Sequence, residues 1–352
     1  MRGRNSTKSG TYVMIISAIS MTPEPDQAVD GKVPIRVQLV PGRRSVYNLG
    51  LRYGTDSGAG VVAGLGRRWV NDRGHKLTLD TNLAQYNSLA TVQYRVPAFG
   101  WLDGWYSYGA TARERVIDEV TSQYIDVFAT RSGRLRGWNL LAGLNFKRER
   151  SDSLDSDEFN YVNLVYPSLW GQWRQADDIN TPQRGHALTM TVRGGSTALA
   201  SDVSFLQLSV AAQYIRGLGS DNRVLLRSEL GATSSNDFAR MPPSMRFFAG
   251  GDRSVRGYGY EEIGEDNGTN VVGGKYLAVA SVEFEHMFTP VWGAAAFVDA
   301  GDAFDQEIDV QYGVGAGLRW RSPVGPVRVD IAHGIGDANQ DVRLHISIGP
   351  DL

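Results

Sequence analysis

The stretch YLAVASVEFEHMF, residues 276–288, places two kinds of side chain on opposite faces of an extended chain. Successive side chains of a β-strand point in opposite directions, so residues two apart share a face. One face is apolar and the other carries hydroxyl and carboxylate groups; the first holds Tyr276, Ala278, Ala280, Val282 and Phe284, and the second Ser281, Glu283 and Glu285. The pattern predicts a strand with apolar surroundings on one side and polar surroundings on the other.

The same period of two recurs along most of the chain and predicts sixteen strands, the first at 45–55 and the last at 341–349. A soluble sandwich also alternates, so the connections must decide between the two architectures. Short turns such as NDRG (71–74) follow even-numbered strands, whereas long polar connections such as 233–274 follow several odd-numbered ones. This pattern predicts an all-β fold, a 16-stranded antiparallel transmembrane β-barrel over residues 45–352 whose short turns face the periplasm.

The composition excludes several kinds of site and partner. None of the 352 residues is cysteine, which excludes disulfides, thiol catalysis and zinc–thiolate sites. The 36 basic and 38 acidic residues are spread along the chain, so nucleic acid is not expected as a partner. No apolar run is long enough for a transmembrane helix, but a membrane strand needs only about 10 alternating residues.

Catalytic and metal-binding signals are weak. The five histidines are scattered and no hydrolase motif is present, so we expect no enzyme, no cofactor and no metal, and interpret His286 and His345 as ordinary wall residues. An acidic segment could offer oxygen ligands to calcium but lacks the central glycine of an EF-hand, which favours a solvated loop. Its acidic residues are Asp152, Asp155, Asp157 and Glu158.

The first 44 residues have two interpretations. Arg2, Arg4 and Lys8 followed by TYVMIISAIS resemble a weak signal peptide, although no small-residue cleavage site follows. Alternatively, MIISAISMTPEP and KVPIRVQLVP are two strands around the polar turn DQAVDGK. We favour the second interpretation, in which residues 1–44 are the end of a small periplasmic domain.

The segment FFAGGDRSVRGYGY, residues 247–260, follows neither a strand period nor a helix period and lies in the longest connection. Such long loops are usually functional or disordered. Several residues that favour burial argue against disorder: Phe247, Phe248, Val255, Tyr258 and Tyr260. Because arginine keeps its proton and its planar fork pairs with carboxylates, we expect an acidic partner for Arg256.

Alternation indicates which carboxylate this is. Phe297, Asp299 and Gly301 share one face of FVDAG, and the interleaved residues form an apolar face. We therefore expect Asp299 to face the lumen and to pair with Arg256, with Gly257 permitting a tight turn at the loop tip.

Four motifs in order resemble the outer-membrane assembly superfamily, whose members insert or transport proteins across bacterial outer membranes. Val255, Arg256, Gly257 and Tyr258 resemble its V/I-R-G-F/Y loop motif, and FVDAG resembles F-x-D-x-G. GAGLRWRSPVGPVRVD (315–330) resembles G-x-G-x-R with a closing aspartate, and YNLGLRYGTDSGAG (47–60) the first strand after a POTRA domain. The stretch RFFAGGDRSVRGY is similar to the TamA branch. The resemblance implies an inward-folded loop on a wall that includes Phe297, Asp299, Gly301, Gly315, Gly317 and Arg319, with a POTRA remnant before the barrel.

The resemblance also implies a lateral seam, at which client strands add to an open strand edge. We expect the first and last strands to close the barrel, but only weakly, because Gly349 has no side chain and Pro350 has no N–H to donate. The seam would consist of Tyr47, Leu49, Leu51, Leu344, Ile346, Ile348 and Gly349.

For function, the TamA resemblance implies a bacterial outer-membrane location and the insertion or translocation of autotransporter-like and other β-barrel proteins. The expected partners are client outer-membrane proteins, outer-membrane lipids and a TamB-like protein anchored in the inner membrane. A two-partner secretion transporter and a BamA-like insertase are alternatives, and a passive porin or a barrel enzyme fits the motifs less well.

Overall fold

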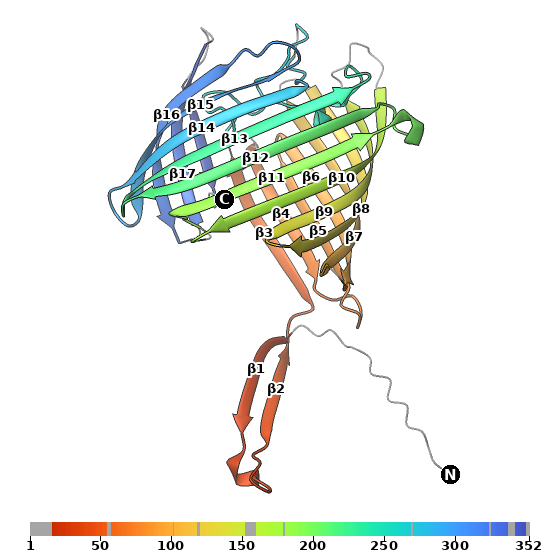
Figure 1. The fold of residues 1–352 in the computed structure, drawn as a ribbon, viewed down its shortest axis with the longest axis vertical. Coiled ribbons are helices and arrows are strands. Elements are labelled where there is room, and N and C mark those ends of the chain that lie inside the picture. The colour runs from red at the N-terminus through yellow and green to blue at the C-terminus, as the bar shows by residue number, and fades with distance from the viewer. Residues whose placement is uncertain are drawn as a thin grey trace.

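The computed structural model describes residues 16–54, 58–100, 102–117, 120–151, 160–178, 180–268, 270–323, 325–336 and 342–349. Its main element is one antiparallel sheet of sixteen strands, in which each strand lies beside its neighbours in sequence. Figure 1 shows this sheet curled around an interior. The strands are β3 (Ser45–Gly54), β4 (Gly58–Arg67), β5 (Lys76–Ala84), β6 (Asn87–Ala98), β7 (Gly104–Ile117), β8 (Val120–Leu135), β9 (Trp138–Ser151), β10 (Asn160–Ala176), β11 (Arg184–Gly195), β12 (Phe205–Leu218), β13 (Asn222–Ser235), β14 (Tyr276–Met287), β15 (Trp292–Phe304), β16 (Gln311–Ser322), β17 (Gly325–Ile335) and β18 (Arg343–Ile348).

The helical content is small. It consists of the 3-10 helices η1 (Pro25–Gln27), η2 (Thr197–Leu199) and η3 (Pro243–Met245). Within the described residues, no helix has the length and apolar character needed to cross a membrane. The sixteen predicted strands correspond in order to β3–β18, so that prediction is confirmed.

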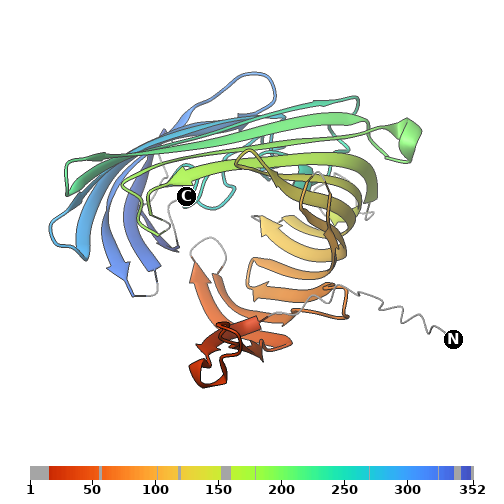
Figure 2. The ribbon, with the colours of Figure 1, turned by 60° about the horizontal axis from the view of Figure 1, so that its bottom comes forward.

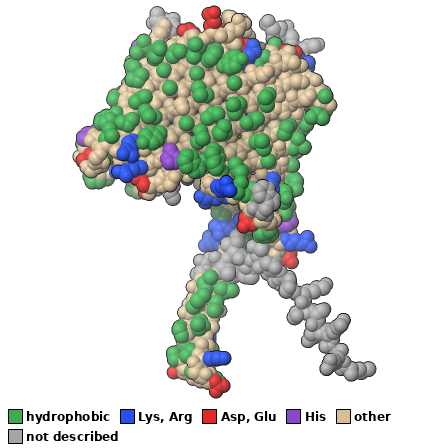
Figure 3. Space-filling model, in the orientation of Figure 1, with side chains coloured by type: hydrophobic (Ala, Val, Ile, Leu, Met, Phe, Trp, Pro, Cys, Tyr) green, Lys and Arg blue, Asp and Glu red, His purple; other side chains and the backbone are tan. Residues whose placement is uncertain are grey.

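The wall has its apolar face on the outside and its polar face on the inside, the reverse of what is found in a soluble protein. Along β14, Glu283 and Glu285 are 5% and 1% exposed, whereas Val282 and Phe284 are 54% and 44% exposed. The apolar face therefore covers the outside of the wall, as Figure 3 shows, and the charged face lines the interior. This is the arrangement of side chains that a strand needs between lipid and a polar lumen.

The two rims differ in their connections. At the lower rim of Figure 1, residues 219–221 suffice to join β12 to β13. At the opposite rim, residues 236–275 join β13 to β14, and this connection turns back into the interior (Figure 2).

The expected closure of the barrel is absent from the described residues. β3 pairs with β4 and β18 pairs with β17, but no ladder joins β3 to β18, although some of their Cα atoms approach within 8 Å. Figure 2 shows the two edges facing each other across the break. The six residues of β18 cannot match the ten of β3, and Gly349 leaves the extended conformation with a φ of +142°.

A hairpin precedes the barrel and projects from its lower rim (Figure 1). Its strands β1 (Ile16–Pro23) and β2 (Ile35–Pro41) are antiparallel. The two predicted strands around a polar turn are therefore confirmed, and their assignment to a POTRA domain stays a prediction. Residues 1–15, on which the signal-peptide interpretation also depends, and the acidic segment 152–159 lie outside the described residues.

Candidate functional site

Residues 236–275, which we call the inner loop, form a folded unit within the barrel. Bridges join Phe247 to Gly274 and Ala249 to Ile263 across it. Its apolar side chains pack on the inner faces of β14 and β15, in a core that consists of Phe247, Ala249, Val255, Tyr258, Ile263, Leu277, Val279 and Ala303. Burial of these side chains stabilises the inward fold of the loop.

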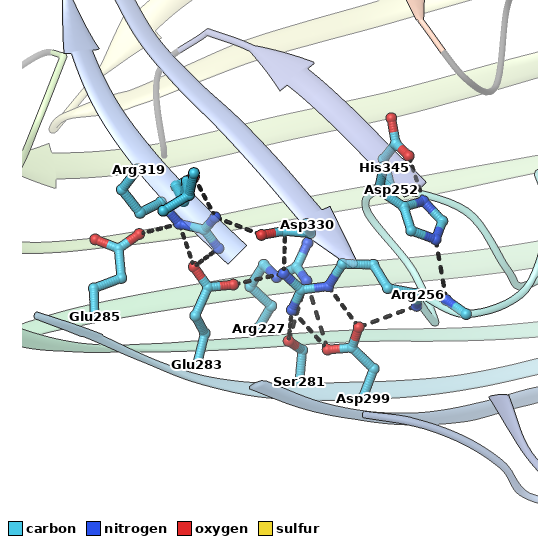
Figure 4. A network of polar contacts seen from close by, with 12 residues as sticks. Arg227, Asp252, Arg256, Ser281, Glu283, Glu285, Asp299, Arg319, Asp330 and His345 are labelled. Atoms are coloured by element: carbon cyan, nitrogen blue, oxygen red, sulfur yellow. Dashed lines mark hydrogen bonds and ion pairs between the residues drawn. The ribbon is translucent and has the colours of Figure 1, made fainter. Parts of the chain in front are cut away.

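Arg256 lies in this loop and is 2% exposed. Its Nε and Nη2 donate to the two carboxylate oxygens of Asp299 at 2.7 and 3.0 Å, and its backbone N–H donates to the same carboxylate at 3.0 Å. Its Nη1 donates to Glu283 Oε2 at 2.7 Å and to Asp330 Oδ2 at 3.1 Å. The guanidinium carbon lies 3.3 Å from the centroid of the Phe297 ring. One side chain thus joins the loop to β14, β15 and β17, as Figure 4 shows for its polar contacts.

A second arginine, Arg319 on β16, shares two of these carboxylates. Its Nη2 donates to Glu283 Oε1 at 2.7 Å, its Nε donates to Glu285 Oε1 at 2.9 Å, and its Nη1 contacts Asp330. Buried ion pairs persist only where charges and hydrogen bonds compensate for lost hydration. Here the ion pairs connect four arginines with four carboxylates, namely Arg223, Arg227, Arg256 and Arg319 with Glu283, Glu285, Asp299 and Asp330.

The charge state of Arg256 is fixed by its surroundings. Burial alone would lower the pKa of Arg256, but the hydrogen bond and charge of Asp299, with the charges of Glu283 and Asp330, raise this pKa above its ordinary value. The guanidinium therefore remains a cation at every pH at which the protein is folded.

Alternate glycines on the inner face of β16 make room for this network. A Cβ on Gly313 would lie 1.8 Å from the backbone oxygen of Arg256. A Cβ on Gly317 would lie 1.8 Å from Asp330 Oδ1. Gly313 must therefore lack a side chain if the loop is to lie against the wall, and Gly317 must lack one to leave space for the Asp330 carboxylate.

The residue after Arg256 connects the inner loop to the last strand. Gly257 has a φ of +99°, and a Cβ on it would lie 2.6 Å from the backbone nitrogen of Gly334, so both conformation and space require glycine. The Gly257 N–H donates to His345 Nε2 at 3.1 Å, which leaves the proton on Nδ1 to be donated to Asp252 Oδ1 at 2.7 Å. An ion pair of 2.8 Å between Arg343 and Glu262 adds a second connection to β18.

The inner loop has another anchor at η3. The Ser244 N–H donates to Glu149 Oε1 at 3.1 Å, and Lys147 Nζ donates to Ser244 Oγ at 2.8 Å. Both Lys147 and Glu149 are buried on β9. Near them, Met241 and Met245 pack with apolar residues of β10 and β12. The loop therefore contacts strands on both sides of the interior, among them β9 and β18.

The structure brings most of the predicted loop and wall residues together. Val255 and Tyr258 lie in the loop core, and Phe297 and Asp299 contact Arg256, as described above. Gly315 leaves space for the Phe297 ring, which would lie 2.4 Å from a Cβ at that position. Gly301, Gly317 and Arg319 lie against wall residues instead. A Cβ on Gly301 would meet Ala278 O and Val279, and one on Gly317 would meet Asp330. Arg319 pairs with Glu283, Glu285 and Asp330.

The sequence did not indicate the part that several residues play in the site. Glu283 was assigned only to a polar face and Asp330 only to a motif, whereas both bind Arg256 directly and link it to Arg319. His345 lies in the wall strand β18, as expected, and its contact with the loop is a role that the sequence did not indicate. The repeat of polar residues along β14 could have indicated Glu283, but nothing in the sequence marks Ser244.

The predicted seam residues lie on the two facing edges. Tyr47, Leu49 and Leu51 project outward from β3 and are between 76% and 88% exposed. On β18, Leu344 and Ile348 are also exposed on the outer face. Ile346 is half-buried between them, and Gly349 directly follows the end of β18. The role of these residues as a seam stays a prediction.

Residues 70–351 match the family model described as the Omp85 superfamily domain. The chain belongs to the Omp85 superfamily. With its BamA relative and BamA-like fold, this membership places the Omp85 protein in the bacterial outer membrane, as predicted.

BamA and CdiB proteins both resemble this chain. Outer membrane protein assembly factor BamA of Nitratidesulfovibrio vulgaris is 27% identical over 180 residues, covering 48% of this chain and 22% of that protein, so the chain spans about a fifth of this curated relative. The structure of BamA from Haemophilus ducreyi lacking POTRA domains 1–3 gives a TM-score of 0.81 at 16% identity, covering 95% of this chain and 75% of that chain. CdiB from Acinetobacter baumannii gives a TM-score of 0.58 at 17% identity, covering 95% and 66%. The structural likenesses establish the fold.

Proposed function

We propose that this Omp85 protein is a TamA-type factor that inserts or translocates autotransporter-like and other β-barrel proteins through the seam between β3 and β18. The observation that carries the proposal is the pair of edges left unjoined, over the described residues, in an otherwise continuous sixteen-stranded sheet. A strand edge offers backbone N–H and C=O groups to which an extended client strand can add.

The two edges differ in a way that supports β3 as the acceptor. β18 is held from inside by the contacts of His345 and Arg343 with the inner loop. On β3, by contrast, Asn48 on the inner face and Leu49 on the outer face are both exposed. A client strand that adds to β3 would extend the sheet while β18 stays in place.

The branch and the partners follow from the motif. The stretch RFFAGGDRSVRGY supports the TamA branch, with a TamB-like protein anchored in the inner membrane as the partner and outer-membrane lipids around the wall. A BamA-like insertase is the second candidate, because the fold is closer to BamA than to CdiB, with TM-scores of 0.81 and 0.58.

A disulfide across the seam tests the proposal. Because the chain has no cysteine, a pair introduced at 47–51 of β3 and 344–348 of β18 would contain its only thiols. Insertion of a radiolabelled autotransporter barrel into proteoliposomes should be lost on oxidation and recovered on reduction. The matched control links Leu49 to Ala63, which are opposite each other within the β3–β4 ladder, and leaves the seam open. Full activity of the seam-locked form would contradict lateral opening.

The same assay separates the two branches. A TamA-type factor should need the TamB-like partner for full activity in reconstituted membranes. Insertion at the full rate without any inner-membrane-anchored partner would instead support the BamA-like alternative.

A further inference from the structure

A group of cations lies on the inner face of the barrel at its lower mouth. Lys76 on β5 is directly opposite Arg95 on β6. Like charges in this position destabilise a sheet. The ring of Trp105 on β7 lies beside both, with its centroid 4.4 Å from Lys76 Nζ and 5.4 Å from the guanidinium carbon of Arg95. The arrangement concentrates positive charge around one aromatic side chain.

This positive charge is poorly compensated. Arg95 lies opposite Lys76 across the β5–β6 pair, and Arg68 lines the same pocket as Lys76, so the charged neighbours on these two sides are both cations. Among the described residues, the buried Nε of Arg95 has no hydrogen-bond partner, and Asp103 is the acidic residue that lines the adjoining pocket. Around Arg256, in contrast, four arginines meet four carboxylates. An uncompensated cluster of this kind fits a site that an anionic ligand completes.

The pocket beside these cations has a volume of 550 Å³ and is lined by Arg68, Trp69, Lys76, Pro97, Phe99 and Trp105, among others. Strand alternation places Lys76, Pro97 and Trp105 on the inner face, together with Arg95. Lipid on the outer face cannot reach them, so a ligand must enter through the lumen or its lower mouth. Aromatic and aliphatic walls next to cations suit a ligand with both an apolar and an anionic group.

We propose that this pocket binds an extended polypeptide segment in which a carboxylate side chain is adjacent to an aromatic or aliphatic one. The carboxylate pairs with Lys76 and Arg95, and its apolar neighbour packs against Trp69 and Phe99. The identification of this polypeptide as a client rests on the proposed function. Because β4 lies next to β3 in the sheet, a client held at β4–β7 is close to the proposed acceptor edge.

Fluorescence anisotropy with two matched peptides tests the site on the full chain in detergent micelles. The probe is a labelled decapeptide of alternating valine and serine with a central Glu-Phe, and the control peptide carries Gln-Phe. The acidic peptide should bind about tenfold more tightly, as expected for charge-assisted hydrogen bonds. The double variant Lys76→Gln/Arg95→Gln should lose this preference, whereas Arg216→Gln, an exposed cation on the outer face of β12, should keep it. Equal binding of the two peptides would overturn the proposal.

Thermal unfolding separates a binding role from a structural one. Lys76→Gln should raise the melting temperature, because it removes one of two opposed like charges. A lower melting temperature would show that Lys76 stabilises the fold and would contradict a site kept for a ligand.

Competition identifies the anionic group. If inorganic phosphate or phosphatidylglycerol micelles displace the acidic peptide and bind with the same dependence on Lys76 and Arg95, the site recognises phosphate, and the polypeptide assignment is wrong. Loss of peptide preference with client insertion intact would contradict a client site and leave the proposed function standing. If the chain keeps its preference for the acidic peptide but inserts no client, the proposed function is contradicted and the peptide site still stands.

Discussion

The two halves of the barrel wall have the same alternation but differ in what covers their inner faces. On β14 and β17, the inner-face residues Glu283 and Asp330 are 5% and 4% exposed. On β3 and β5, the inner-face residues Asn48 and Asp80 are exposed. The pattern of polar and apolar residues therefore determines which way a side chain points, whereas the inner loop determines whether it is buried.

The difference predicts a gradient of stability around the barrel. The inner loop contacts the wall from β7, where Arg115 forms an ion pair of 2.9 Å with Glu261, through β9 to β18. Regions with few buried contacts open more readily than densely packed ones. We expect the β3–β6 side, which borders the seam, to be the less stable half.

The largest effect should come from Arg256→Ala. The change leaves Asp299, Glu283 and Asp330 buried without their shared cation, which should cost about 3–5 kcal/mol of unfolding free energy. Urea unfolding followed by tryptophan fluorescence measures it. The matched control is Arg253→Ala, an exposed arginine three residues earlier in the same loop. Equal destabilisation by the two changes would mean that the buried network does not stabilise the wall.

A smaller effect on the unfolding free energy is expected when a methyl group is added at one glycine in each half of the barrel wall. Gly313→Ala would drive a Cβ into the Arg256 carbonyl and should cost about 1–3 kcal/mol by overpacking. Gly50→Ala on β3 meets nothing within 4 Å and should leave the unfolding free energy nearly unchanged. Heat-dependent mobility in gels compares the two variants. A similar loss for both would contradict the difference between the halves.

His345→Ala should act locally. It removes the acceptor of the Gly257 N–H and the donor to Asp252, at a cost of about 1 kcal/mol for each hydrogen bond. Hydrogen exchange should accelerate in β18 and remain unchanged in β14 and β15. His286→Ala, on the exposed face of β14, is the control. Uniform acceleration across all the strands would contradict a local connection.

The smallest effect should come from Asp80→Asn. Asp80 is an exposed inner-face residue, so removing its charge should change the unfolding free energy by less than about 0.5 kcal/mol. The same loss of charge by Glu283→Gln should destabilise far more, since Glu283 binds two buried arginines. Chemical denaturation of both variants tests whether a charge matters only where the loop covers it.

Much of the fold could be predicted from the sequence. The period of two is a local property, so alternation located the sixteen strands, assigned Glu283 to a polar face and indicated that Asp299 faces the lumen. The pairing of Arg256 with Asp299 was also predictable, because a buried guanidinium needs a carboxylate on that face.

The remaining features depend on distances that alternation does not contain. Alternation gives the face of a side chain but not its height along the barrel, so it could not show that Asp330 and Glu283 reach the same guanidinium. Nor could it show that η3 brings Ser244 to Glu149, 95 residues earlier in the chain. The unjoined edges were missed because pairing of β3 with β18 depends on the curvature of the entire sheet.

The chain positions of the Arg256 contacts bear on how the barrel is assembled. The side chains bound by its guanidinium, from Ser281 to Asp330, all follow it in sequence, at separations of 25 to 74 residues. Contacts close in sequence cost less chain entropy and form sooner than distant ones. We expect β14–β18 to assemble against the inner loop. The amino-terminal strands of the barrel, although synthesised first, would then be the last to reach their final positions. At that stage β3 would still have β4 as its one neighbouring strand.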